Sequence, residues 1–283
     1  MTELKCRTAV VTGASRGIGV HIARLLARHG VKLALVARSE DTLRALAAEL
    51  SQAGAQAVAI PADLSDLNGL DSVLDRAQTE LGPLDLLVNN AGIEGVRSYL
   101  SESDADTETM LRLNLLSPML LTRKAVSRMV PRKTGHVVNI GSLAGKNSTP
   151  YCVSYAAAKA GLIAFTHCVR AELLGSGVSA SVITPGFVSE EGMFAEKAAP
   201  RGIRVSPILG TSRPEQVAQA VLAAYRDDRA EIVVNPGPIL LMQAINQIAP
   251  SAIAWLQNRI GVNGMLRTMA LGDDTVRERV VPR

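Results

Sequence analysis

The sequence has few aromatic residues and few cysteines, and these shortages exclude several kinds of function. Phenylalanine, tryptophan and tyrosine together make up 3% of the 283 residues. The net charge is +4, but lysine and arginine are dispersed along the chain, whereas a nucleic-acid interface needs clustered positive charge. The three cysteines and four histidines lack the spacing of metal ligands. We therefore expect neither a nucleic-acid partner nor a metal site.

Cysteine usage and the first residues of the chain both favour a cytoplasmic protein. An odd number of cysteines suits a reducing compartment better than an oxidising one. Residues 1–5 lack the apolar core of a secretory signal sequence. Cytoplasmic location is accordingly our expectation.

The chain lacks internal repeats, low-complexity tracts and linkers rich in proline or serine, which favours a single domain. Short apolar runs alternate with segments of helical periodicity, and this alternation predicts a parallel sheet covered by helices on both faces. The expected strands are 8–12, 32–37, 56–60, 84–89, 136–140, 178–184 and 231–235, and the expected helices are 20–29, 41–53, 66–81, 103–130, 151–174 and 213–226.

A glycine-rich segment, residues 12–19, lies between the first expected strand and the first expected helix. Glycine at Gly13 and Gly17 permits a tight turn and close approach of a ligand, while Gly19 permits close packing of helix on strand. The amino terminus of the helix then offers free N–H groups to a pyrophosphate. A glycine-rich loop alone is weak evidence, but its place between strand and helix favours a nucleotide site.

Tyr155 and Lys159 lie four residues apart, and Ser142 lies thirteen residues before Tyr155. On a helix, positions i and i+4 share a face, so the ammonium group lies beside the phenol. A fixed cation favours phenolate and is expected to lower the pKa of Tyr155. Together with the Ser142 hydroxyl, this pair predicts a general acid–base device for a carbonyl or an alcohol. The alternative is a tyrosine and a lysine on a solvated helix face.

Five motifs resemble those of the short-chain dehydrogenase/reductase family, over about residues 5–235. They are TGxxxGxG at 12–19, NNAG at 89–92, the set Ser142, Tyr155 and Lys159, the helix residue Asn114, and Pro185-Gly186. This resemblance implies an α/β fold, a Rossmann-like doubly wound parallel sheet of seven strands, with a nicotinamide cofactor beyond the carboxyl ends of the strands.

The resemblance also implies a role for each matching residue. Ser142 would hold the substrate oxygen, Tyr155 would transfer the proton, Lys159 would assist it and bind the cofactor ribose, and Asn114 would hold a water. The implied cofactor-binding residues are Gly13, Ser15, Arg16, Gly17, Ile18, Gly19, Arg38, Asp63, Leu64, Asn90, Ala91, Gly92, Tyr155, Lys159, Pro185, Gly186 and Val188.

The residues after the second strand favour NADP(H) over NAD(H). Family members that prefer NAD place a carboxylate at the position of Ala37, whereas this chain has Ala37 followed by Arg38. A guanidinium pairs well with a 2′-phosphate, and Arg16 in the glycine loop offers a second cation. The alternative is that Arg38 only ends the strand and points into water, without binding a phosphate. Asp63 matches the adenine-contacting Asp of the family, although it could equally cap a helix.

Two segments depart from the family pattern. Glu190 stands where the family often has a threonine that contacts the cofactor, so Ser189 or the backbone of Val188 would have to replace it. Residues 189–210 are then expected to form a wall of the substrate pocket. The catalytic domain is expected to span 1–237, and a helical extension to span 238–283.

Three roles are open for this extension: a lid over the substrate cleft, an oligomer contact, or a membrane contact through residues 238–258. Residues 232–258 contain no charged side chain, but Pro250 and neighbouring Gln and Asn residues argue against a membrane-spanning helix. A lid or an oligomer contact is favoured. Similar extensions in family members that reduce lipid-like ketones imply a hydrophobic substrate.

The predicted function is NADPH-dependent reduction of a ketone or aldehyde, or the reverse oxidation of an alcohol. One alternative is a reductase of carrier-bound 3-oxoacyl chains, which would need a basic docking patch near the cleft mouth, with Arg128, Arg132 and Lys133 as candidates. Another is a nucleotide sensor or scaffold without turnover. The resemblance implies a homodimer or homotetramer paired through the helices at 103–130 and 151–174.

Overall fold

The computed structural model describes residues 7–189, 202, 205, 210–237 and 239–271. Seven parallel strands form one sheet in the order β3-β2-β1-β4-β5-β6-β7. The strand order reverses at β1, because β2 and β3 lie on one side of it and β4 to β7 on the other. This is the order of a Rossmann-like doubly wound sheet, and it confirms the predicted fold class. The strands are β1 (Thr8–Thr12), β2 (Lys32–Ala37), β3 (Ala57–Pro61), β4 (Leu86–Asn89), β5 (Gly135–Ile140), β6 (Val178–Pro185) and β7 (Glu231–Val234).

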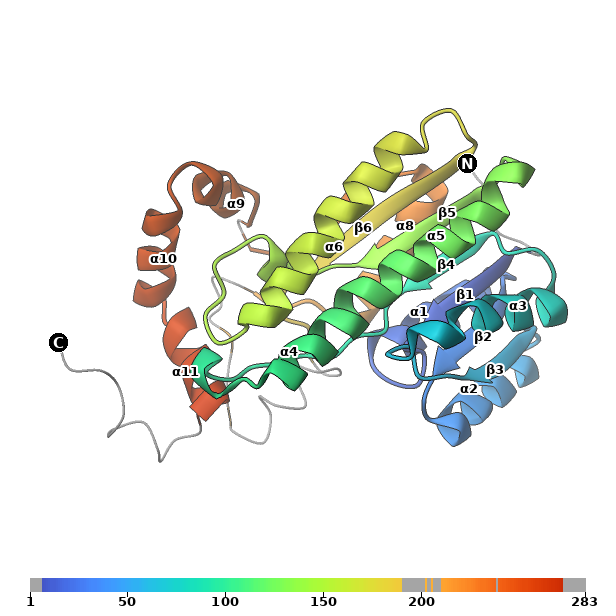
Figure 1. Ribbon diagram of the computed structural model, residues 1–283, viewed down its shortest axis with the longest axis horizontal. Helices are drawn as coiled ribbons and strands as arrows, with labels where there is room; N and C mark the ends of the chain where they lie inside the picture. Colours follow the sequence, from blue (N-terminus) through green and yellow to red (C-terminus); the bar gives the residue numbers. More distant parts are fainter. Residues whose placement is uncertain (1–6, 190–201, 203–204, 206–209, 238, 272–283) are drawn as a thin grey trace.

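Helices cover both faces of the sheet, which is why the central strands are apolar on both sides. Helices α1 (Ile18–Arg28), α2 (Glu40–Gln52) and α8 (Pro214–Asp227) pack on one face. Helices α3 (Leu70–Leu81), α5 (Ser117–Met129) and α6 (Val153–Glu172) pack on the other, and α5 and α6 cross the front of the sheet in Figure 1. Each helix directs one apolar stripe into the core.

The expected single helix over 103–130 is interrupted. It consists of α4 (Asp104–Leu111), a π-helical turn at Arg112–Leu116, and α5. The Ser103–Asp106 capping box begins α4. A π turn adds one residue to a helical turn and is frequent at functional sites. Short 3₁₀ segments also occur within the described residues, at Leu67–Gly69, Tyr99–Ser101, Val130–Arg132 and Leu143–Gly145.

The carboxyl-terminal helices lie beyond the carboxyl ends of the strands (Figure 1). They are α9 (Ile239–Ile248), α10 (Pro250–Arg259) and α11 (Val262–Leu271). Ile253, Val262 and Leu266 pack with Leu143 and Cys152 in a hydrophobic cluster separate from the two that flank the sheet. In the described part of the chain, no helix combines the length and the apolar character needed to cross a membrane.

Basic residues at the end of α5 lie at the opposite edge of the sheet from these helices. Arg132 donates to the Leu84 carbonyl at 2.8 Å and to the Asp85 carboxylate at 2.6 Å, just before β4 begins. Arg128 pairs with Asp75 at 2.6 Å. The prediction of a basic patch at the cleft mouth from Arg128, Arg132 and Lys133 is therefore wrong, because α5 runs antiparallel to the strands and ends at their amino edge.

Candidate active site

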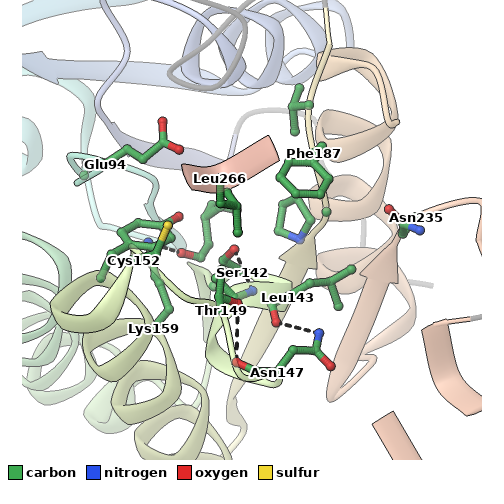
Figure 2. Close-up of a pocket in the computed structure, with 18 of the residues that line it drawn as sticks. Glu94, Ser142, Leu143, Asn147, Thr149, Cys152, Lys159, Phe187, Asn235 and Leu266 are labelled. Atoms are coloured by element: carbon green, nitrogen blue, oxygen red, sulfur yellow. Dashed lines mark hydrogen bonds between the residues drawn. The ribbon is translucent and has the colours of Figure 1, made fainter. Parts of the chain in front are cut away.

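A cavity of about 190 Å³ lies at the carboxyl ends of β4, β5 and β6. Figure 2 shows it between the loop after β5, helix α6 and the carboxyl-terminal helix α11. Nine of the predicted site residues line it: Ile18, Asn90, Gly92, Ser142, Tyr155, Lys159, Pro185, Gly186 and Val188. Further lining side chains come from α10 and α11, namely Gln257, Val262 and Leu266. The cavity therefore joins the sheet motifs to the carboxyl-terminal helices.

Ser142 stands directly after β5 and begins the 3₁₀ turn Leu143–Gly145. Its hydroxyl oxygen accepts a hydrogen bond from the Ala144 amide at 3.2 Å, which fixes the start of that turn. A Cβ at Gly145 would lie 2.6 Å from the backbone of Lys159, so only glycine lets this turn pack directly on α6. This close packing brings Ser142 beside the catalytic candidates of α6.

Tyr155 and Lys159 lie on one face of α6, as their spacing predicts. The Lys159 ammonium group donates to the Ile140 carbonyl at 2.8 Å and lies 5.7 Å from the centre of the Tyr155 ring. Lys159 is only 4% exposed. Burial lowers its pKa from 10.5 to about 8, because the charged form loses its hydration. At that pKa the ammonium group can exchange a proton near neutral pH.

The pKa of Tyr155 is raised, contrary to the sequence prediction. Burial of the hydroxyl is the largest cause, and the negative charge of Glu94 adds to it, while the neighbouring Ser142 hydroxyl partly offsets both. The prediction from the i, i+4 spacing considered only the adjacent lysine. Burial of both groups in one site outweighs that single neighbour, so the neutral phenol is the favoured form.

Asn114 lies in the π turn between α4 and α5 and is completely buried. Its side-chain oxygen accepts from the Ile93 amide at 3.2 Å, and its amide group donates to the Ile93 carbonyl at 3.0 Å. A Cβ at Gly92 would lie 2.5 Å from the Asn114 Oδ1 and 3.8 Å from the Lys159 Nζ. Gly92 therefore separates Asn114 from Lys159, and Asn114 stands just behind the cavity wall.

The glycine loop packs against the NNAG segment at the end of β4. The Thr12 hydroxyl oxygen accepts from the amides of Asn90 at 2.9 Å and Ala91 at 3.0 Å. Gly13 has φ +67°, and a Cβ there would lie 2.8 Å from the Cα of Ala91. The other loop residues of the prediction, Ser15, Arg16 and Gly17, lead into Gly19 at the start of α1.

Helix α1 begins after Gly17, and no side chain in the described part of the chain caps it. Its first turn also contains no acidic residue. The Val20 amide donates to the Gly17 carbonyl at 3.1 Å, and the positive end of the helix dipole lies beside the glycine loop. This arrangement fits a pyrophosphate, and the glycine loop leaves the space that such a group needs.

Arg38 and Asp63 follow β2 and β3 along the same edge of the sheet. Hydrogen bonds from the Ser65 amide (2.9 Å) and hydroxyl (2.7 Å) lower the pKa of Asp63, and the charge of Arg38 adds a smaller contribution. Arg38 is exposed, whereas Leu64 is buried in the core between β3 and α3. Leu64 thus offers a ligand its backbone at most, and none of these three residues lines the cavity.

The segment after β6 forms an isolated parallel β-bridge with Ser212. The Ser189 amide donates to the Ser212 carbonyl at 2.9 Å, and the Ser212 amide donates to the Phe187 carbonyl at 2.9 Å. This bridge positions Phe187 and Val188 on the cavity wall. Glu190 and most of the predicted pocket wall 189–210 lie outside the described residues.

Sequence reasoning missed several residues of the cavity. Glu94 is one, although it is the second residue after the NNAG motif and the strand before it ends at this edge. Asn147 and Thr149 belong to the loop between Ser142 and α6, and their place between two predicted catalytic residues could have indicated that they line the cavity. Residues of α10 and α11 carried no such signal, because their place over the cavity depends on tertiary packing.

Comparisons with known proteins agree with this geometry. The family model described as short chain dehydrogenase matches residues 7–202. A ketoacyl reductase, HetN, of Nostoc sp. is 39% identical over 267 residues, 93% of this chain and 92% of the relative. A 3-oxoacyl-[acyl-carrier-protein] reductase of Synechocystis sp. is 33% identical over 236 residues, 83% of this chain and 95% of the relative.

Two solved structures are similar over most of their length. A metagenomic short-chain oxidoreductase in complex with NADP has a TM-score of 0.70 and 32% identity, covering 82% of this chain and 98% of that one. A short-chain dehydrogenase/reductase from Burkholderia phymatum in complex with NAD has a TM-score of 0.79 and 26% identity, covering 89% and 96%. Both nicotinamide cofactors thus occur among similar proteins.

Proposed function

The chain belongs to the short-chain dehydrogenase family, and from that premise we propose that it reduces an apolar ketone or aldehyde with NADPH. It is an NAD(P)-dependent oxidoreductase acting on ketones; the cofactor preference and the apolar substrate are the proposal. The observation that carries it is the meeting of Ser142, Tyr155 and Lys159 on one cavity wall, with Asn114 directly behind.

The four residues have distinct roles in this proposal. Ser142 and Tyr155 hold the carbonyl oxygen, and Tyr155 donates its proton as negative charge develops there. Lys159, held by the Ile140 carbonyl, restores the proton, which a pKa of about 8 permits near neutral pH. Asn114 keeps the Gly92–Ile93 backbone in place beside Lys159. The nicotinamide, when bound, supplies the hydride.

The raised pKa of Tyr155 favours reduction over alcohol oxidation. A proton donor must be protonated before the reaction, and both burial and the Glu94 charge keep the phenol neutral. In the reverse direction Tyr155 would act as a base and would first have to lose that proton. We therefore propose carbonyl reduction as the direction that is faster at neutral pH.

NADPH is the proposed cofactor because Arg38 replaces a carboxylate after β2 and Arg16 lies in the glycine loop. Both guanidinium groups are exposed at the edge where an adenosine phosphate would bind. Arg38→Gln should reduce kcat/KM with NADPH about 10- to 100-fold while leaving NADH nearly unchanged. Arg44→Gln, on the surface of α2, is the matched control. An unchanged NADPH preference in Arg38→Gln would contradict this choice.

The carboxyl-terminal helices are proposed to act as a lid on a catalytic domain that spans 1–237. Val262 and Leu266, together with Leu143 and Phe187, give the cavity apolar walls, which supports a hydrophobic substrate. The Asn246 amide group donates to the Lys146 carbonyl at 3.1 Å, so α9 also holds the loop after Ser142. If residues 238–258 instead contact a partner subunit or a membrane, substitutions in α9 and α10 should leave the affinity for the substrate unchanged.

A second candidate is reduction of carrier-bound 3-oxoacyl chains, favoured by the similarity to the 3-oxoacyl-[acyl-carrier-protein] reductase of Synechocystis sp.. Arg128, Arg132 and Lys133 lie at the amino edge of the sheet, away from the cavity, which argues against docking of a carrier protein through these residues. A homodimer or homotetramer in the cytoplasm is our proposal for its state in the cell. Cys152 and Cys168, the cysteines in the described residues, form no disulfide, which suits a reducing compartment.

The first test is NADPH oxidation, followed by absorbance, across ketones of graded size and one carrier-bound 3-oxoacyl thioester. Rates that rise with apolar bulk and require Tyr155 would support the main proposal. Turnover of the thioester alone would favour the second candidate. Binding of NADPH without any turnover would leave a nucleotide sensor.

A further inference from the structure

Glu94 stands out on the cavity wall because of its charge. Among the described residues that line the cavity, it is the one acidic side chain, and Lys159 is the one basic side chain. Figure 2 shows the Glu94 carboxylate and Asn235 on opposite sides of the pocket, with Leu266 between them in the view. A carboxylate in such a cavity affects which ligands can enter.

The carboxylate and the proton donor share one poorly hydrated region. The negative charge of Glu94 contributes to the raised pKa of the Tyr155 phenol, second only to burial. Both side chains line the same cavity, whose volume is about 190 Å³. In a cavity of this size, a substrate whose carbonyl oxygen meets Tyr155 places atoms a few bonds away along the walls, to which Glu94 belongs.

We infer that Glu94 selects carbonyl compounds that carry a hydrogen-bond donor, an ammonium or a hydroxyl group, a few bonds from the carbonyl carbon. This inference rests on the proposed reductase function and adds a substrate class to it. An ionised carboxylate only accepts hydrogen bonds, and a bond to a charged group is stronger than one between neutral groups. It therefore favours a substrate with a donor, repels a second carboxylate, and offers an alkyl chain no hydrogen bond.

The remaining walls fix the rest of the preferred substrate. Leu143, Phe187, Val262 and Leu266 contribute apolar surface. The substrate class is therefore amphipathic, with an apolar body against these side chains and a donor directed to Glu94. A plain 3-oxoacyl chain lacks that donor and is expected to be a poorer substrate.

Three matched ketones test the inference, identical except for an ammonium, a hydroxyl or a methyl group at one position. The wild-type protein should show kcat/KM about 10- to 100-fold higher for the donor-bearing ketones than for the methyl ketone. Glu94→Gln should lose most of the ammonium preference but keep part of the hydroxyl preference, because its amide oxygen still accepts. Glu94→Leu should lose both preferences. Glu102→Gln is the matched control. Glu102 lies, like Glu94, in the connection between β4 and α4 but does not line the cavity, so the substrate preferences of this variant should match wild type.

Two results would overturn the inference: equal kcat/KM for all three ketones in wild type, or an unchanged preference in both Glu94 variants. Thermal unfolding of each variant verifies folding, and the nearly isosteric Glu94→Gln suffices if Glu94→Leu does not fold. If no ketone is reduced, the proposed function fails, and the role of Glu94 in ligand selection is then tested by calorimetric binding measurements. NADP-loaded protein would then be titrated with the three corresponding alcohols. Tighter binding of the donor-bearing alcohols that depends on Glu94 supports it, and indifferent binding overturns it.

Discussion

The two edges of the sheet bury polar side chains in different ways. At the amino edge, Asp85 is 7% exposed and accepts hydrogen bonds from the Thr8 amide at 3.0 Å and from Arg132 at 2.6 Å. At the carboxyl edge, Tyr155 and Lys159 face a cavity. Both edges pair a buried charge with groups of the same chain, since Lys159 donates to the Ile140 carbonyl, but only at the carboxyl edge do the described side chains also border a cavity of about 190 Å³.

This difference shows why residue type alone does not identify a site. Both edges contain a buried charged side chain and a histidine or tyrosine with a strongly shifted pKa. Burial causes these shifts at both edges. What distinguishes the active edge is the open cavity, because a shifted pKa serves chemistry only where a substrate can approach.

The largest effect should come from Tyr155→Phe, which removes one hydroxyl from the carboxyl edge. If Tyr155 is the proton donor, kcat/KM for ketone reduction should fall about 10²- to 10⁴-fold. Thermal stability should change little, because the ring still lines the cavity. Steady-state kinetics and a melting curve of the same preparation check both statements. Tyr151→Phe is the matched control, and equal losses in the two variants would contradict the assignment of Tyr155.

At the amino edge, Asp85→Asn should destabilise the fold without impairing the chemistry. The change removes the charge that Arg132 and Arg7 face, and the expected loss in unfolding free energy is about 2 to 4 kcal/mol. Well below the melting temperature, kcat/KM should stay within about twofold of wild type. Urea unfolding and kinetics measure the two quantities.

Glu49→Gln provides the control for the Asp85 prediction, since its carboxylate pairs with Arg24 on the surface and should affect stability less. A large loss of activity in folded Asp85→Asn would break the comparison between the edges.

The sequence predicted the sheet and the core of the site because both depend on short-range periodicity. Continuous apolar runs mark strands buried on both faces, and the helical repeat places Tyr155 and Lys159 together. The fold, the family and the reaction class are confirmed. The roles of the individual site residues and the division at residue 237 remain predictions.

Features that depend on distant segments escaped the sequence. The pKa of Tyr155 rises because burial and Glu94 act on it from parts of the chain that spacing does not connect. The π turn at Asn114 needs one extra residue in a helical turn, which leaves the apolar pattern almost unchanged. The direction of α5 decided where Arg132 lies, and a charge pattern carries no information about direction.

Acid should destabilise the amino edge through His136. Burial lowers the pKa of His136 from 6.5 to about 4, and its Nε2 lies 2.8 Å from the Ser181 hydroxyl. The unfolded chain thus binds more protons between these two values, so stability falls as pH falls from about 6.5 to about 4. His136→Gln should reduce the stability difference between about pH 7.5 and about pH 5 by about 2 kcal/mol. Urea unfolding at the two pH values measures it.

The surroundings of His136 contain opposing charges, since Asp228 raises its pKa and Arg170 lowers it. Because burial exceeds both, the sign of the prediction does not depend on either neighbour. His29→Gln, an exposed position at the end of α1, is the matched control and should leave the pH dependence as in wild type. A steep acid loss that persists in His136→Gln would assign it to other groups.

The smallest expected effect concerns the link between α9 and the loop after Ser142. Asn246→Ala removes the hydrogen bond to the Lys146 carbonyl, which is worth about 1 kcal/mol. If the carboxyl-terminal helices act as a lid, KM for a bulky apolar ketone should rise about two- to fivefold, with kcat nearly unchanged, because the chemical groups remain in place. Asn258→Ala, exposed on α10, is the control. Equal KM values in wild type and both variants would contradict a role for the link between α9 and this loop in substrate binding, and would restrict any lid function to α10 and α11, whose side chains line the cavity.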